Sequence, residues 1–253
     1  MIWRCAALLT VAAVFYPCLE VSSFLLDLAG SARGRRRASG RWRTRVFRSW
    51  CRLYASILGM RTSVVGLPPQ PPFLLVSNHL GYLDILLLAS QLPCVFVSKA
   101  EVAHWPIIGH FCRAVDTIFL DRANKRELPR VMRQIDRVCS GGRGVVFFPE
   151  GTSTSGHEVR EFRPSLLEAA ARSGRPVSYA SLSYRTQDPC PPARDAVCWW
   201  GDTEFRTHVI RLMKLPGFEA RLKFGKEPIQ SADRKVLASR LHEAVQQQFE
   251  AVV

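Results

Sequence analysis

Negative charge is scarce in this 253-residue chain, which carries 35 Lys and Arg residues against 21 Asp and Glu residues. The imbalance is local, because residues 33–52 hold nine arginines and no acidic residue. Nucleic acid is a common partner of such a run. The preceding segment, Ile2 to Leu28, is mostly apolar, and no residue between Cys5 and Leu19 is charged. A basic run beside an apolar segment favours an anionic membrane surface over nucleic acid, and we expect no nucleic acid partner.

Several common site patterns are also missing from the sequence. The eight cysteines include no Cys-x2-Cys pair, which argues against a zinc site and fits small buried side chains in a reducing compartment. The stretch 141–144 lacks both the Gly-Lys-Ser of a phosphate-binding loop and the dinucleotide spacing. Ser153 and Ser155 do not form the Gly-x-Ser-x-Gly turn of a serine hydrolase.

The chain divides into three expected segments. Residues 1–30 would be a membrane-embedded segment, residues 31–59 a basic interfacial segment, and residues 60–253 the globular domain. A membrane span needs about 20 apolar residues. Pro17 and Glu20 make the first segment marginal, so it either crosses the membrane once or lies partly embedded. The arginines that follow would stay on the cytoplasmic side.

Strand-like and helix-like runs alternate through the globular domain. The candidate strands are Phe73–Ser77, Val95–Ser98, Ile118–Leu120, Gly144–Phe148, Pro176–Leu182 and Glu219–Phe224. The candidate helices are Asp84–Gln91, Lys125–Cys139, Ser165–Ser173 and Ala232–Gln248, and Gly141 and Gly142 would end the second of them. This alternation predicts an α/β fold with a mixed, largely parallel sheet flanked by helices.

An imidazole and a carboxylate lie five positions apart after the first of these strands, at His79 and Asp84. At about 100° per residue, two side chains on one helix at this spacing point about 140° apart. They can meet only if His79 lies in the turn before a helix and Asp84 in its first turns. A histidine held in one tautomer by an aspartate can act as a general base. The alternative is a surface histidine beside a helix cap.

Two more polar clusters follow later strands. Phe148 to Ser153 supplies a carboxylate, a glycine and two hydroxyls, which could hold a phosphate or a hydroxylated ligand, or simply cap a helix. Between the clusters, Asp116 to Arg122 forms a short strand that ends in a charged pair. Arg122 could bind a phosphate with two hydrogen bonds, or could lie in solvent at the end of the strand.

Taken in this order, the clusters resemble the glycerophosphate and lysophosphatidate acyltransferase family. Its Asn-His-x4-Asp motif matches Asn78 to Asp84, and its Phe-Pro-Glu-Gly-Thr-Ser motif matches Phe148 to Ser153. Its strand ending in an arginine matches Ile118 to Arg122. Its proline-containing fourth strand matches Arg175 to Ala180 loosely, because the second proline usual in the family is absent. The resemblance covers roughly residues 60–230.

The resemblance implies the acyltransferase fold and a membrane-bound O-acyltransferase with the lipid bilayer as a partner. The enzyme would move a fatty acyl group from an acyl-CoA or acyl-carrier-protein thioester to the hydroxyl of a lysophospholipid. The implied acceptor is 1-acyl-sn-glycerol-3-phosphate, which would give phosphatidic acid. A lyso-ornithine lipid or another lysolipid is the alternative, since the Trp199 to His208 segment is similar to that subset of the family.

The family motifs also assign roles to individual residues. His79 would be the catalytic base and Asp84 would orient it, with the thioester as co-substrate and no further cofactor or metal. The expected substrate-binding residues are Arg122, Glu150, Gly151, Thr152, Asn78 and Lys99. Because a carboxylate repels a phosphate, we expect Glu150 to order Arg122 or the loop.

Two hypotheses of other classes compete with this one. A non-catalytic membrane scaffold could keep the fold, although the intact His79 and Asp84 motif argues against it. A metal hydrolase would need further ligands beside His79 and Asp84, and His104, His110 and His157 show no ligand-like spacing.

Overall fold

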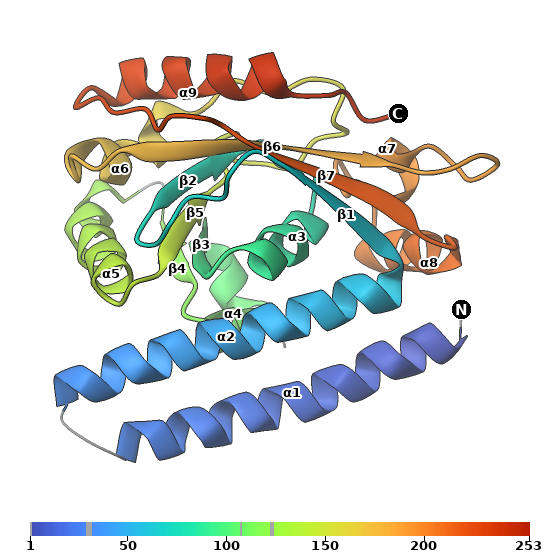
Figure 1. Ribbon diagram of the computed structural model, residues 1–253, viewed down its shortest axis with the longest axis horizontal. Coiled ribbons are helices and arrows are strands. Elements are labelled where there is room, and N and C mark those ends of the chain that lie inside the picture. Colours follow the sequence, from blue (N-terminus) through green and yellow to red (C-terminus); the bar gives the residue numbers. More distant parts are fainter. Residues whose placement is uncertain (1, 29–31, 107, 122–123) are drawn as a thin grey trace.

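A seven-stranded sheet organises the computed structural model of the chain, which describes residues 2–28, 32–106, 108–121 and 124–253 (Figure 1). The strands lie in the order β1-β7-β6-β2-β5-β3-β4. They are β1 (Met60–Val65), β2 (Leu74–Ser77), β3 (Cys94–Lys99), β4 (Ile118–Leu120), β5 (Gly144–Phe147), β6 (Val177–Arg185) and β7 (Phe218–Phe224). The five strands from β6 to β4 are parallel, and β7 and β1 run opposite to them. The predicted mixed, largely parallel sheet is confirmed.

The central strands explain why the sheet could be predicted. Every residue of β2 and β5 is buried, and a strand covered on both faces is a continuous apolar run rather than an alternating one. Each of the six predicted strands corresponds to one of β2 to β7. The missed strand, β1, lies at the sheet edge with five of its six residues exposed. Its sequence therefore lacks the apolar run by which the buried strands could be predicted.

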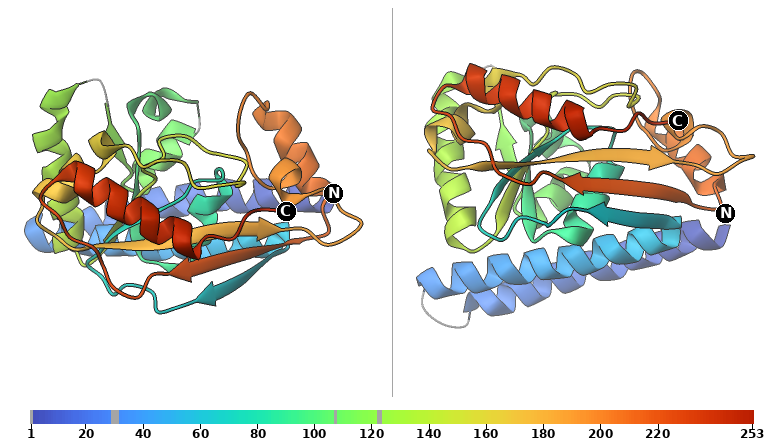
Figure 2. Two further views of the ribbon diagram at one scale, coloured as in Figure 1. Left: turned by 90° about the horizontal axis from the view of Figure 1, so that it is seen from above. Right: turned by 45° about the horizontal axis from the view of Figure 1, so that its top comes forward.

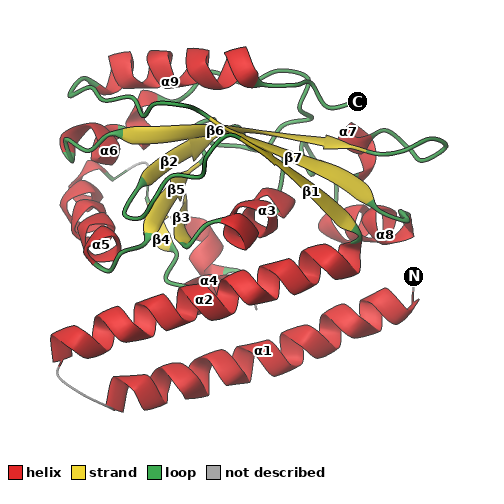
Figure 3. Cartoon of the chain, viewed as in Figure 1, coloured by secondary structure: helices red, strands yellow, loops and turns green. Residues whose placement is uncertain are grey.

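Helices cover both faces of the sheet (Figure 3). The helices α5 (Leu128–Ser140), α6 (Glu168–Arg172) and α9 (Arg234–Gln248) pack on one face. The other face carries α2 (Ala32–Leu58), α3 (Leu83–Gln91), α4 (Ile108–Ala114), α7 (Ala193–Ala196) and α8 (Phe205–Lys214). As predicted, α5 ends at Gly141 and Gly142, and Gly142 has the positive φ of 73° that a helix end favours.

The first two helices form an antiparallel hairpin along one side of the domain (Figures 1 and 2). In α1 (Ile2–Leu28), the carbonyl of Leu8 accepts a hydrogen bond from Tyr54 at 2.6 Å. Near the other end of α1, the Trp42 indole donates to the Ser22 hydroxyl at 2.7 Å. Contacts near both ends therefore hold α1 along α2, and α2 lies between α1 and the sheet.

The inner side of α2 belongs to the core of the domain. Its buried apolar residues pack with α3 and the sheet, and they are Phe47, Cys51, Ala55 and Leu58. Arg48 and Arg52 donate to the carbonyl of Ser90 in the last turn of α3, and Arg48 also donates to that of Gln91. Cations at a helix C-terminus satisfy carbonyls that lack helical partners. These two arginines of the basic run thus contact the domain, whereas Arg41 and Arg45 are exposed.

Candidate active site

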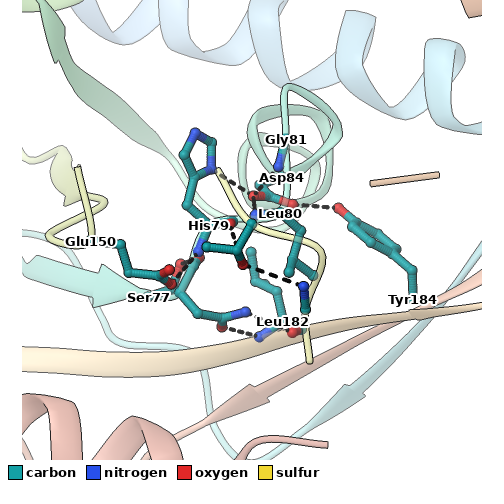
Figure 4. A network of polar contacts seen from close by, with 11 residues as sticks. Ser77, His79, Leu80, Gly81, Asp84, Glu150, Leu182 and Tyr184 are labelled. Carbon is teal, nitrogen blue, oxygen red and sulfur yellow. Dashed lines mark hydrogen bonds and ion pairs between the residues drawn. The ribbon is translucent and has the colours of Figure 1, made fainter. Parts of the chain in front are cut away.

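His79 and Asp84 meet at the carboxyl end of β2, in the geometry that the sequence predicted (Figure 4). The chain leaves β2 at Ser77, turns, and enters α3 with Asp84 in its first turn. His79 precedes the helix, and its Nδ1 lies 2.7 Å from Oδ2 of Asp84. The Asp84 side chain is fully buried, whereas that of His79 is 21% exposed. One partner is therefore shielded from water while the other can reach a substrate.

The Asp84 carboxylate accepts hydrogen bonds from four groups. Oδ2 accepts from the backbone N–H groups of Leu80 at 2.6 Å and Gly81 at 3.1 Å, in addition to the His79 ring. Oδ1 accepts from the Tyr184 hydroxyl at 2.8 Å. This network fixes the Asp84 side chain in the orientation that contacts the imidazole.

The other nitrogen of the His79 ring is the one available for proton transfer. Because ionised Asp84 only accepts hydrogen bonds, Nδ1 must carry the proton and Nε2 is left with a free lone pair. Figure 4 shows Nε2 pointing away from Asp84. The ring stacks on Phe148, with 4.2 Å between the ring centroids. A histidine with one nitrogen fixed and the other open is arranged as a general base.

Gly81 permits the close approach of a distant segment to this turn. A Cβ atom at Gly81 would lie 2.9 Å from the backbone nitrogen of Trp199, which donates to the Leu80 carbonyl at 2.8 Å. Tyr82, the next residue, contacts the rings of Trp199, Phe205 and His208. The Trp199 to His208 segment therefore packs against the turn between His79 and Asp84.

Glu150, at the end of β5, holds the same turn from the other side. Its Oε1 accepts the backbone N–H of His79 at 2.8 Å, and Thr154 donates its backbone N–H to the His79 carbonyl at 2.9 Å. Among the described residues, Oε2 of Glu150 has no partner. Burial raises the pKa of Glu150 to about 8, against the opposing effect of the His79 N–H. Glu150 thus orders the turn that carries His79.

The buried Glu150 carboxyl makes stability depend on pH. In the unfolded chain the group ionises near its ordinary pKa of 4.5, whereas the folded protein keeps the proton up to about pH 8. The free energy of unfolding therefore falls as pH rises through this window, by at most about 1.4 kcal/mol per pH unit. We expect Glu150→Gln, which cannot ionise, to lack this loss. Thermal unfolding of both proteins between about pH 5 and about pH 9 measures it, and parallel profiles would contradict the assignment.

The remaining expected substrate residues fall into two groups. Asn78 is buried, and its side chain exchanges two hydrogen bonds with the backbone of Leu182, at 3.0 and 2.7 Å, so it fastens β2 to β6. Gly151 and Thr152 follow Glu150 at the carboxyl end of β5. Lys99 is exposed at the carboxyl end of β3, paired with Leu120 of β4. Because these strands are parallel to β2, their carboxyl ends lie on the same side of the sheet as His79. Arg122 lies outside the described residues.

Tyr184 is the site residue that sequence reasoning missed. It lies on β6, buried with 2% exposure, one hundred residues along the chain from Asp84. A tyrosine in an apolar strand is typical of a core residue, and no local spacing indicates its partner. Sequence reasoning also misses Thr154, which lies one position beyond the end of the matched motif at Ser153.

We expect Tyr184→Phe to lower kcat by roughly tenfold, because it removes one charge-assisted hydrogen bond to Asp84. KM for both substrates should change little. Without this donor the carboxylate attracts the imidazole proton more strongly, so the acid limb of the pH–rate profile should move to higher pH. Tyr54→Phe, which removes the hydroxyl bonded to Leu8, is the matched control. A change in KM alone, with an unmoved pH profile, would show that Tyr184 does not act through Asp84.

The fold and the site together define a class of protein, an α/β protein with a histidine–aspartate pair at the carboxyl ends of the parallel strands. The family model described as Acyltransferase matches residues 61–182. A lyso-ornithine lipid O-acyltransferase of Rhodobacter capsulatus is 35% identical over 205 residues, covering 77% of this chain and 72% of the relative. The chain belongs to this acyltransferase family, and the predicted family and enzyme class are confirmed.

Further relatives and one solved structure agree with this assignment. A lyso-ornithine lipid O-acyltransferase of Pseudomonas aeruginosa is 33% identical, covering 80% of this chain and 78% of the relative. A 1-acyl-sn-glycerol-3-phosphate acyltransferase of Neisseria meningitidis serogroup B is 27% identical, covering 72% of each chain. The crystal structure of the 1-acyl-sn-glycerophosphate acyltransferase PlsC of Thermotoga maritima matches with a TM-score of 0.60 at 19% identity, over 96% of this chain and 97% of that one. This structural match confirms the predicted fold.

Proposed function

We propose that the chain transfers a fatty acyl group from an acyl-CoA or acyl-carrier-protein thioester to the hydroxyl of a lysolipid, with a lyso-ornithine lipid as the preferred acceptor. The His79–Asp84 pair carries the proposal for the reaction, because its open Nε2 can take the proton of a hydroxyl. The relatives support the acceptor. Those named lyso-ornithine lipid O-acyltransferase are 35% and 33% identical, against 27% for the 1-acyl-sn-glycerol-3-phosphate enzyme of Neisseria.

The reaction runs by direct transfer between two bound substrates. His79 accepts the hydroxyl proton as the oxygen attacks the thioester carbonyl, and Asp84 stabilises the resulting imidazolium. The imidazolium then returns the proton to the departing thiolate. The thioester is already activated, so holding the two substrates together suffices and no acyl-enzyme is required. The thioester acts as co-substrate, and the residues named so far supply the remaining groups without a further cofactor.

The acceptor headgroup would lie beyond the carboxyl ends of β3 and β4. Lys99 at the end of β3 supplies a positive charge there, and Arg122 follows β4 in the sequence. A headgroup carboxylate or phosphate pairs with such cations. Gly151 and Thr152 lie beside Glu150 at the same sheet edge and complete the proposed headgroup site.

The second candidate acceptor is 1-acyl-sn-glycerol-3-phosphate, which would give phosphatidic acid. The Neisseria relative, with its 72% coverage of each chain, favours it. A non-catalytic scaffold would have no need for the four donors that surround Asp84.

Acceptor preference is tested by competition. The purified full-length chain is given one labelled acyl thioester and equimolar lyso-ornithine lipid and 1-acyl-sn-glycerol-3-phosphate, and the products are separated by mass. We expect the ornithine product to dominate, and a dominant phosphatidic acid product would support the second acceptor instead. If the chain acylates neither acceptor with either donor type but acylates another lysolipid, that lysolipid is the acceptor and the proposal for the ornithine lipid is wrong.

We further propose that α1 lies along the membrane surface, with the catalytic domain on the cytoplasmic face. Among the described residues, α1 is the helix long and apolar enough to cross a membrane, over Trp3–Ser22, by length and composition only. Its contacts with α2 run from Leu8 to Ser22, and α2 carries the arginines. A crossing α1 would therefore draw charged α2 into the bilayer, which is costly. The exposed apolar residues of α1 would instead enter one leaflet, and they include Trp3, Leu9, Val14, Val21, Phe24 and Leu25.

We expect Val14→Asp combined with Val21→Asp to weaken binding to anionic vesicles by about tenfold or more, since two apolar side chains leave the lipid and two acids enter it. Both residues are 59% exposed, so the fold should be unaffected. The control is Val236→Asp, which changes an exposed valine on α9. Binding is measured by vesicle sedimentation at low salt and at about 1 M salt, where the Debye length is about 3 Å. Complete release of the unaltered chain by salt alone would contradict an embedded helix.

A further inference from the structure

A second polar site lies at the amino ends of the parallel strands, whereas His79 lies at their carboxyl ends. A cavity of about 950 Å³ opens where α2, the turn between α4 and β4, and the connection from α5 to β5 come together. It adjoins the amino ends of β4 and β5, whereas the catalytic residues lie at the carboxyl ends of the strands. The length of β5, about 10 Å, separates the two regions. The cavity is therefore distinct from the proposed acyl-transfer site.

The cavity lining is strongly basic. Four arginines line it, from α2, α4, α5 and the α5–β5 connection, with one aspartate among them: Arg43, Arg113, Arg137, Arg143 and Asp116. Both carboxylate oxygens of Asp116 are engaged, by Arg43 at 3.2 Å and by Arg143 at 2.6 Å. Asp116 has a positive φ of 63°, which non-glycine residues seldom adopt. It therefore arranges two guanidinium groups in a lining that holds four arginines and one aspartate.

Arg143 is a buried arginine of the cavity lining whose hydrogen-bonding groups are not all satisfied. Its side chain is only 8% exposed, and within the described part of the chain its Nε has no hydrogen-bond partner. Burying a charged donor without a partner is costly. Gly40 of α2 makes room for it, since a Cβ atom there would lie 2.7 Å from Nη2 of Arg143. A glycine inside a helix lowers the stability of the helix, so the other contacts of α2 must offset this loss.

We propose that this cavity binds the phosphate of an anionic phospholipid headgroup, at a site separate from the one that holds the acyl acceptor. Guanidinium groups match phosphate oxygens with paired hydrogen bonds, and four of them favour an anion of more than one oxygen. The position supports a lipid source, because Gly40 and Arg43 belong to the same hairpin whose other helix exposes the apolar residues of α1. The inference rests on the proposed membrane placement and is independent of acyl transfer.

The test measures binding of short-chain, soluble dihexanoyl phosphatidylglycerol to the purified full-length chain in neutral detergent, by calorimetry. We expect saturable binding, weakened about tenfold or more by Arg113→Gln combined with Arg137→Gln. Both arginines are exposed at the cavity wall, so the variant should fold. Arg41→Gln combined with Arg45→Gln removes equal charge from exposed positions on α2 that do not line the cavity, and should change affinity less than about twofold.

A third variant leaves the charge unchanged. Gly40→Ala favours the helix but displaces the Arg143 guanidinium, so it should weaken phosphatidylglycerol binding while the protein stays folded. Equal weakening by the two double variants would show diffuse charge attraction and overturn the site. Absence of saturable binding would overturn it as well. Equal affinity for inorganic phosphate would overturn the lipid source, and dihexanoyl phosphatidylcholine should bind more weakly than phosphatidylglycerol.

Discussion

The variant His79→Ala should lose acyl transfer by about 100- to 10,000-fold, the range that general base catalysis supplies. Nε2 of His79 is the proposed proton acceptor, and the ring is held by a 2.7 Å contact to Asp84. The lost ring is partly exposed and its backbone contacts with Glu150 and Thr154 remain, so the fold should persist. Initial rates of product formation at saturating donor and acceptor measure the loss, with circular dichroism and thermal unfolding as checks of folding.

The matched control for this variant is His242→Ala. His242 lies on α9, on the other face of the sheet, where its Nε2 contacts the Val159 carbonyl. Its removal should leave the rate within about twofold, as expected for a residue remote from the reaction. A His79→Ala protein that keeps more than roughly a tenth of the activity would remove His79 from the role of base.

Asp84→Ala should cost both activity and stability. The change leaves the buried N–H groups of Leu80 and Gly81 and the Tyr184 hydroxyl without their acceptor. An unsatisfied buried group costs about 1–3 kcal/mol, so we expect a loss of about 3 kcal/mol or more in the free energy of unfolding. Activity should fall to the level of the His79 variant, because the imidazole loses both its orientation and its counter-charge.

Asp84→Asn separates these two effects. Its amide oxygen can take the position of Oδ2 and accept the Leu80, Gly81 and His79 donors, while its NH2 faces the Tyr184 oxygen. Stability should therefore approach that of the unaltered chain, whereas activity should still fall by about 100-fold or more, because the negative charge beside the imidazolium is gone. Urea unfolding and initial rates measure the two quantities, with Asp136→Ala, at a largely exposed ion pair on α5, as the control. An active Asn variant would show that Asp84 serves the fold alone.

The contact between His79 and Asp84 could be predicted because its determinants are local. His79 and Asp84 lie five positions apart, and the rotation per residue of a helix requires a turn before the helix if the two side chains are to meet. The sheet could be predicted because β2 and β5 are fully buried and, apart from Ser77, contain no polar side chain. The edge strand β1 has no such pattern, so it was missed.

The groups that the sequence did not reveal act over long separations. Tyr184 reaches Asp84 only because β6 lies beside β2 in the sheet, and no spacing indicates that neighbour. The charge of residues 33–52 predicts a segment that faces the membrane. The same segment also contributes Phe47 and Cys51 to the core, which its charge does not indicate. Asn78 belongs to the matched motif, but its contacts with Leu182 fasten two strands together, a use that motif matching does not distinguish from substrate binding.

The most direct test of the account is the release of thiol from an acyl thioester by the purified full-length chain, measured with and without a lysolipid. We predict that release requires the lysolipid, equals the amount of doubly acylated lipid formed, and disappears in His79→Ala. Both acyl-CoA and acyl-carrier protein are supplied in turn, so that donor preference does not obscure the result. Release without lysolipid, with free fatty acid as the product, would contradict the account and identify a thioesterase.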